Sequence, residues 1–147
     1  SAPADQAAAT EDDTWRLRVL SGEVHDDNAS ALQGAGHAGL FSTAASLLDF
    51  AAARLSDTGP DALIRTPLSA RRTHGWERPY EGWSGGERCS PQTIGHTGFT
   101  GVSLWLDPGS DTYVVVLSNV IHQRGGPPIT RLAGQVATAA GRALGLG

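Results

Sequence analysis

The apolar residues between positions 43 and 55 recur with the period of an α-helix. They fall at i, i+3, i+4 and i+8, which places them on one helix face: Leu47, Phe50, Ala51 and Leu55. Ser42 or Thr43 stands just before this stretch, and either hydroxyl can accept from the free N–H groups of the first turn. The segment 57–60 (Asp-Thr-Gly-Pro) ends the helix, because proline disfavours the helical conformation in the residue before it.

Two later segments have the composition of β-strands. Residues 102–106 form one, and residues 112–118 (Thr-Tyr-Val-Val-Val-Leu-Ser) are β-branched and aromatic, which suits a buried strand. Residues 107–111 between them (Asp-Pro-Gly-Ser-Asp) have turn-forming side chains. The pattern therefore predicts a β-hairpin over residues 102–118.

A second amphipathic helix follows the hairpin. Pro127 and Pro128 are tolerated in a first helical turn. Six apolar residues then form one stripe that predicts packing on a sheet face: Ile129, Leu132, Ala133, Val136, Ala140 and Ala143. The order of a helix, strands and a helix, without internal repeats, predicts an α+β fold with an antiparallel sheet packed by helices.

The first 40 residues are less regular. Residues 1–14 are rich in Ala, Pro and acidic side chains, which predicts a disordered or loosely attached segment. Residues 15–20 (Trp-Arg-Leu-Arg-Val-Leu) alternate in part and fit either a short strand or extended chain. Residues 34–39 (Gly-Ala-Gly-His-Ala-Gly) predict a tight turn before the first helix. We therefore expect the folded domain to span residues 15–147.

Composition narrows the class of protein. The chain has 147 residues, enough for one domain with a real core. Its net charge of −4 is accounted for by the four acidic residues among the first 13 positions. The remainder carries no net charge, which argues against a basic surface for binding nucleic acid. No apolar run approaches the ~20 residues of a membrane-spanning helix. Cys89 is the single cysteine, which excludes an internal disulfide and leaves the redox compartment open.

The candidate chemistry lies in residues 95–101 (Gly-His-Thr-Gly-Phe-Thr-Gly), which run directly into the predicted strand at 102–106. Taken alone, this step fits an ordinary β-bulge or turn. Three further blocks accompany it in order: 22–29 (Gly-Glu-Val-His-Asp-Asp-Asn-Ala), 34–43 (Gly-Ala-Gly-His-Ala-Gly-Leu-Phe-Ser-Thr) and 103–108 (Ser-Leu-Trp-Leu-Asp-Pro). Together the blocks resemble the C-terminal part of the β-lactamase-related serine hydrolases, over roughly residues 15–145. This group includes class C β-lactamases, DD-carboxypeptidases, penicillin-binding proteins and related esterases.

In that family a His-Thr-Gly or Lys-Thr-Gly step is the third of three motifs. The first, Ser-x-x-Lys, is absent because the chain contains no lysine, and neither Tyr-x-Asn nor Ser-x-Asn occurs. The resemblance therefore implies the C-terminal portion of a β-lactamase/transpeptidase-like fold that is inactive alone. Its partners would be an N-terminal fragment carrying the nucleophile and a small-molecule or peptide acyl substrate. The alternative is a non-catalytic module that binds peptide or cell-wall ligands.

The resemblance also implies roles for four residues. His96 and Thr97 would face the cleft and hold the carboxylate of the substrate. His96 replaces the commoner lysine, so its charge would depend on pH. Gly98 would let the substrate backbone approach closely. The backbone N–H of Phe99 would be one of two oxyanion-hole donors, the second coming from the absent nucleophile.

Trp105, His37 and His122 are candidates for the rim of the cleft. Each also has a structural interpretation, as a core residue, a turn residue and a solvated loop residue respectively. The block 25–28 (His-Asp-Asp-Asn) suggests a metal or a His-Asp dyad, but its spacing matches no zinc pattern. We expect no metal and no cofactor. The resemblance leaves the compartment open: exported for a DD-peptidase or β-lactamase, cytoplasmic for an esterase.

Overall fold

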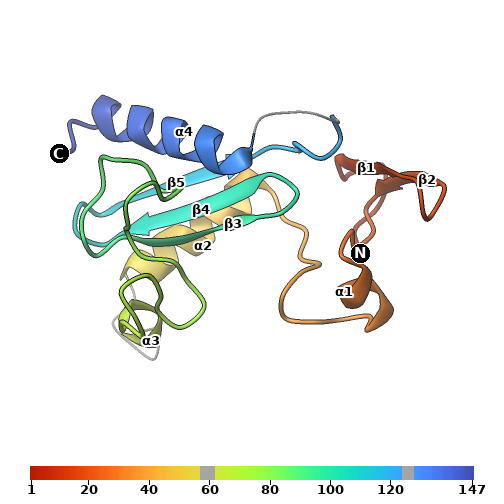
Figure 1. Cartoon of the computed structure of the whole chain (residues 1–147), viewed down its shortest axis with the longest axis horizontal. Helices are drawn as coiled ribbons and strands as arrows, with labels where there is room; N and C mark the ends of the chain where they lie inside the picture. Colours follow the sequence, from red (N-terminus) through yellow and green to blue (C-terminus); the bar gives the residue numbers. More distant parts are fainter. Residues whose placement is uncertain (57–61, 124–127) are drawn as a thin grey trace.

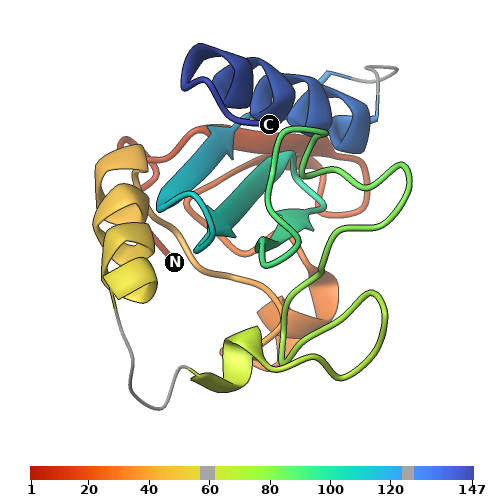
Figure 2. The same cartoon turned by 90° about the vertical axis from the view of Figure 1, so that its left-hand side faces the viewer.

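The computed structural model describes residues 1–56, 62–123 and 128–147. The elements are β1 (Ala9–Asp13), β2 (Arg18–Ser21), α1 (Asp27–Ala31), α2 (Ala44–Ser56), α3 (Ala62–Arg65), β3 (Ile94–Gly98), β4 (Val102–Asp107), β5 (Thr112–Leu117) and α4 (Ile129–Ala143). A three-stranded antiparallel sheet in the order β3-β4-β5 forms the centre, and β1 and β2 form a separate two-stranded sheet. The helices α2 and α4 lie on opposite faces of the central sheet (Figures 1 and 2).

The strand register decides which side chains meet each helix. Ile94 pairs with Leu106, and on the α2 face these two residues form a buried cluster with Ala51. The next pair in the ladder is Gly95 and Trp105, and the Trp105 side chain packs with Ala137 of α4 on the other face. The alternation of side chains along a strand therefore divides the core into two layers. The predicted α+β arrangement, with helices packed on an antiparallel sheet, is confirmed.

The buried stripe of α4 differs from the predicted one. Ala133, Ala137 and Gly141 are its buried residues, whereas Leu132 and Val136 are each 37% exposed. The reason is steric: two large indole rings already fill the space between the helix and the sheet. Only small residues allow the helix backbone to approach that layer, so a ridge of Ala and Gly faces inward.

The start of α2 follows the predicted cap. Thr43, not Ser42, supplies it, because the Thr43 Oγ1 accepts from the N–H of Ser46 at 3.2 Å. Ala51 is fully buried, but Phe50 is 42% exposed, so the predicted apolar face is only partly covered. The predicted helix stop at residues 57–60 lies outside the described residues. So does Pro127, while Pro128 is the residue that caps α4.

Residues 1–14 contain a strand that the sequence pattern did not predict. Residues 9–13 pair antiparallel with β2, with Asp13 opposite Arg18. The strand is acidic and lacks apolar alternation, so only its backbone pairing with β2 reveals it. The predicted strand at 15–20 is shorter than expected, because the chain turns at Leu17 with a φ of 54°. Within the described parts of the chain, no helix has the length and apolar character needed to cross a membrane.

Candidate functional site

β3 is an edge strand, and its outer side is only partly covered. At Gly95 the backbone bonds outward to Glu77, with N···O distances of 2.8 and 3.1 Å. In an antiparallel ladder, alternate residues direct their N–H and C=O groups to the same side. The backbone groups of Thr97 therefore point to the outer edge as well, and Phe99 lies just beyond the strand, in the turn that follows it. This edge offers backbone donors and acceptors to a ligand lying beside β3.

The ring of His96 has two hydrogen-bond partners. Its Nε2 lies 3.1 Å from Nη1 of Arg72, and its Nδ1 lies 2.6 Å from the carbonyl oxygen of Thr97. A guanidinium only donates and a carbonyl only accepts. Both contacts are hydrogen bonds in the tautomer whose Nε2 accepts from Arg72 and whose Nδ1 donates to Thr97. The ring therefore bridges the guanidinium and the backbone of the motif strand.

The permanent positive charge beside β3 belongs to Arg72. Its second terminal nitrogen, Nη2, lies 3.1 Å from Oε1 of Glu77, and its side chain is 51% exposed. Glu77 is itself held against the edge by the backbone bonds to Gly95. The loop 72–77 therefore carries a guanidinium to the motif strand and holds it there from both sides. Arg72 was not among the predicted site residues, because no pattern in the sequence relates it to a strand 24 positions later.

His96 and Thr97 lie on opposite faces of the sheet. His96 pairs with Leu104, which packs toward α2, whereas Thr97 pairs with Ser103 and faces the α4 side. The two side chains therefore flank the free edge from either face. The expectation that both face a cleft stays a prediction.

Packing within the sheet explains why two positions of the motif are glycines. A Cβ on Gly95 would collide with the indole of Trp105, which lies across it from the neighbouring strand. A Cβ on Gly98 would stand 2.6 Å from Cγ2 of Val102, its partner on β4. The family resemblance relates Gly98 to the approach of a substrate backbone. A side chain at this position would also crowd Val102 within the sheet.

Phe99 begins the turn that leads from β3 into β4. Its side chain is 78% exposed, and its ring stacks on that of His25 with a centroid distance of 5.8 Å and an interplanar angle of 24°. The turn is closed by a bond from the N–H of Gly101 to the carbonyl of Gly98 at 3.0 Å. The segment following β5 supports it, because the N–H of Val120 donates to the carbonyl of Thr100.

The three rim candidates have different positions. Trp105 is 2% exposed and packs edge-on against Trp83 at 4.8 Å, so it belongs to the core and not to a cleft rim. The His37 Nε2 lies 2.9 Å from Oδ1 of Asp26, the residue that caps α1. His122 is exposed beyond β5, and its N–H donates to the carbonyl of Asn119 at 3.3 Å. None of these contacts involves the backbone edge of β3.

The block 25–28 is explained by separate contacts. The His25 Nε2 lies 2.6 Å from Oε2 of Glu11. Asp26 accepts from the N–H of Ala29 at 2.8 Å, and this bond, with that of His37, lowers the pKa of the Asp26 carboxyl below its ordinary value. Among the residues that the structure describes, no three His, Cys, Asp or Glu side chains gather as metal ligands.

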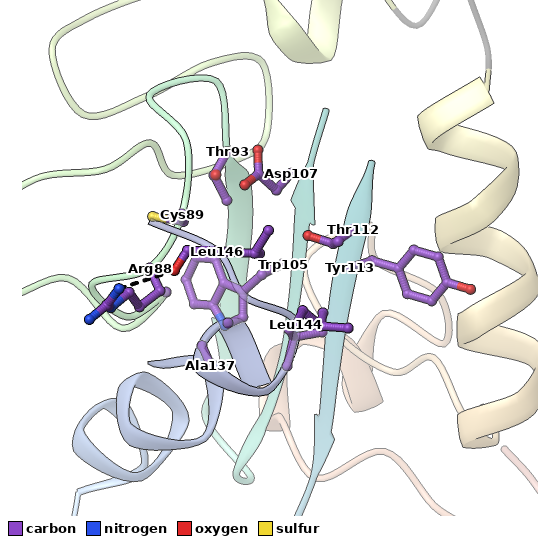
Figure 3. A pocket seen from close by; sticks show the side chains of 13 residues that line it. Arg88, Cys89, Thr93, Trp105, Asp107, Thr112, Tyr113, Ala137, Leu144 and Leu146 are labelled. Carbon is purple, nitrogen blue, oxygen red and sulfur yellow. Dashed lines mark hydrogen bonds between the residues drawn. The ribbon is translucent and has the colours of Figure 1, made fainter. Parts of the chain in front are cut away.

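A buried carboxylate at the end of β4 gives no signal in the sequence and was not predicted. Asp107 is 5% exposed and accepts from Ser90, from the N–H of Gly109 at 3.0 Å and from the hydroxyl of Ser110 at 2.8 Å. Burial acts to raise the pKa of Asp107, but these hydrogen bonds outweigh it and lower the pKa below its ordinary value. Figure 3 shows Asp107 near Thr93 at one end of a small pocket between the sheet and α4. Asp107 thus ties the hairpin to the segment preceding β3.

An antiparallel sheet covered by a helix on each face, with a glycine-bounded His-Thr-Gly step on its edge strand, fits the α+β fold that the resemblance implies. The profile of the family described as Beta-lactamase matches residues 1–138, so the chain belongs to the β-lactamase family.

Curated relatives have similar sequences. The chain is 33% identical over 126 residues to a protein of Salmonella gallinarum named "Putative D-alanyl-D-alanine carboxypeptidase", covering 73% of this chain and 29% of the relative. It is 34% identical over 124 residues to a Bacillus subtilis protein named N-acetylmuramyl-L-alanine amidase, covering 73% of this chain and 28% of the relative. The chain thus spans less than a third of the length of these relatives. No solved structure matches the chain.

Proposed function

We propose that this chain supplies the substrate-binding wall of a penicillin-recognising serine hydrolase of the β-lactamase, DD-peptidase or esterase type. The observation that carries the proposal is the outer backbone edge of β3, which Glu77 covers at Gly95, beside the Arg72–His96 pair. The family membership and the carboxypeptidase name of a relative support the same class. The nucleophile and its lysine would come from a part of the hydrolase outside these 147 residues.

The acyl substrate would lie antiparallel to β3 as an added strand. The N–H of Phe99 would donate to the carbonyl oxygen as negative charge develops on it during attack by the serine. The second donor would be the N–H of the serine itself. One such donor typically contributes about 10²–10³ in rate. The carbonyl of Thr97 keeps a second lone pair beyond the one engaged by His96, so it can also accept from a substrate amide.

A carboxylate on the substrate would be bound chiefly by Arg72. A guanidinium stays charged throughout the physiological pH range and forms strong bonds with carboxylates. His96, whose Nε2 contacts the guanidinium of Arg72, would orient that group toward the ligand. The hydroxyl of Thr97 would approach the ligand from the opposite face of the sheet.

A second candidate function is a non-catalytic module that binds peptide or cell-wall ligands along the same edge. It is favoured by one observation, the absence of lysine and hence of Ser-x-x-Lys from this chain. Both functions use the same backbone groups of β3, and they differ in whether an acyl group is transferred to a serine.

Covalent labelling distinguishes the two functions. We expect the complete hydrolase to be labelled by a fluorescent penicillin or a fluorophosphonate, and the 147-residue chain alone to remain unlabelled. His96→Ala should slow acylation, and Thr97→Val should weaken carboxylate-bearing substrates most. Labelling of the isolated chain would contradict the assignment of the nucleophile to another segment. A complete protein that binds peptide but is never labelled would support the non-catalytic module.

A further inference from the structure

The aromatic ring of Phe99 meets a histidine from the other end of the chain. The rings of His25 and Phe99 lie 5.8 Å apart at 24°, which is a stacked arrangement. Phe99 is otherwise 78% exposed, so this ring contact is a large part of what restrains its side chain. The residue directly before it, Gly98, has no side chain to restrict the backbone, whereas the carbonyl of Thr100 after it accepts from Val120.

His25 is itself held on two sides. Its Nε2 lies 2.6 Å from the carboxylate of Glu11 on β1, which fixes the plane of the ring. Its carbonyl accepts from Nη2 of Arg16 at 3.1 Å, and the neighbouring carbonyl of Val24 accepts from Nη1 of the same guanidinium at 3.0 Å. The Arg16 side chain is 9% exposed and also pairs with Asp27 at 2.5 Å. The loop that carries His25 is therefore anchored through both its backbone and its ring.

We propose that His25, anchored by Glu11, is a positioning residue that restrains Phe99, whose N–H is the proposed oxyanion donor. The inference rests on the proposed function, because it assigns a task to the oxyanion donor of that site. The mechanism is conformational restraint. Gly98, directly before Phe99, adds backbone freedom, and fixing the Phe99 side chain in one place reduces that freedom before the substrate binds. Through His25, the small sheet of β1 and β2 would support the backbone N–H of Phe99 in the proposed site.

The test uses the complete hydrolase and four variants: His25→Ala, His25→Phe, Glu11→Gln and, as a control at an exposed position outside the proposed site, Leu63→Ala on α3. The interaction free energy of a stacked aromatic pair corresponds to a change in rate of about 2- to 10-fold. We expect His25→Ala to lower the acylation rate by that factor while KM changes less than about twofold. His25→Phe should restore at least half of the rate because it keeps a ring, Glu11→Gln should give a smaller loss, and the control should match the wild type.

A double-mutant cycle separates positioning from general destabilisation. In a Phe99→Ala background, His25→Ala should cause no further loss of rate, because the contact is already gone. Equal acylation rates for the wild type and His25→Ala in an active enzyme would overturn the role of His25 and leave the proposed function intact. The role of His25 is likewise overturned if His25→Ala slows acylation equally with and without the Phe99 ring. A wild-type protein that is never acylated would instead overturn the proposed function, and this role with it.

Discussion

The permanent cation of the proposed site can be tested by replacing Arg72 with glutamine. The glutamine amide would retain a donor for the Nε2 of His96 but carry no charge. The guanidinium now contacts both His96 and Glu77 at 3.1 Å, so its removal changes the charge beside β3 without touching the strand backbone. The variant therefore isolates the electrostatic contribution to carboxylate binding.

The expected size of the effect follows from the exposure of Arg72. Hydrogen bonds between charged groups contribute about 1.5–3 kcal/mol, which corresponds to about 10- to 150-fold in kcat/KM. The Arg72 side chain is 51% exposed, and solvent screening of an exposed charge places the effect at the lower end of this range. We expect R72Q to lower kcat/KM about 10-fold for a carboxylate-bearing ester and less than about twofold for the matched neutral ester.

The assay is the ratio of kcat/KM for the two esters, measured with the complete hydrolase from about pH 5.5 to about pH 8.5, a range that brackets the ordinary histidine pKa. In the wild type this preference should be constant, because a guanidinium does not titrate in this range. A clamp formed by an imidazolium would instead lose its preference as the pH rises through about 6.5, the ordinary histidine value. A wild-type preference that falls with pH, or one that survives R72Q, would refute the assignment of the charge to Arg72.

Three further predictions concern stability and are measured by thermal or denaturant unfolding. Gly95→Val places a branched side chain where the indole of Trp105 lies, and overpacking of this kind should cost about 1–3 kcal/mol or prevent folding, whereas unchanged stability would contradict the packing argument. Asp107→Asn removes a charged acceptor of several hydrogen bonds and should also cost about 1–3 kcal/mol near neutral pH. Because the folded pKa of Asp107 is lowered, its contribution is fully present above the ordinary value of about 3.9 and is lost as the pH falls through the folded pKa. The gap between wild type and Asp107→Asn should therefore close in acid, and a constant gap would argue against a charge effect. Thr43→Ala should cost about 1 kcal/mol through loss of the cap of α2, with Ser42→Ala as a neutral control.

Much of the secondary structure could be predicted because it depends on local patterns. The helix beginning at Ala44 follows from its apolar period and its cap, and the hairpin of β4 and β5 follows from a turn between two β-branched segments. β1 could not be predicted, because an acidic strand has no periodic signal and exists through its pairing with β2. The inward stripe of α4 was predicted incorrectly, since Trp83 and Trp105 on other segments decide which residues fit.

The sequence by itself determined the family and the motif strand, because the glycine-bounded His-Thr-Gly step and its ordered companion blocks are local features. Only the tertiary structure decided which groups act on that strand. It brings the guanidinium of Arg72 to the imidazole of His96, and it stacks His25 on Phe99. The physical reason is that the charge beside a strand and the orientation of its side chains depend on what lies within hydrogen-bond or ring contact, and these neighbours come from distant parts of the chain. The charge of the proposed site therefore belongs to a residue that the motif does not contain.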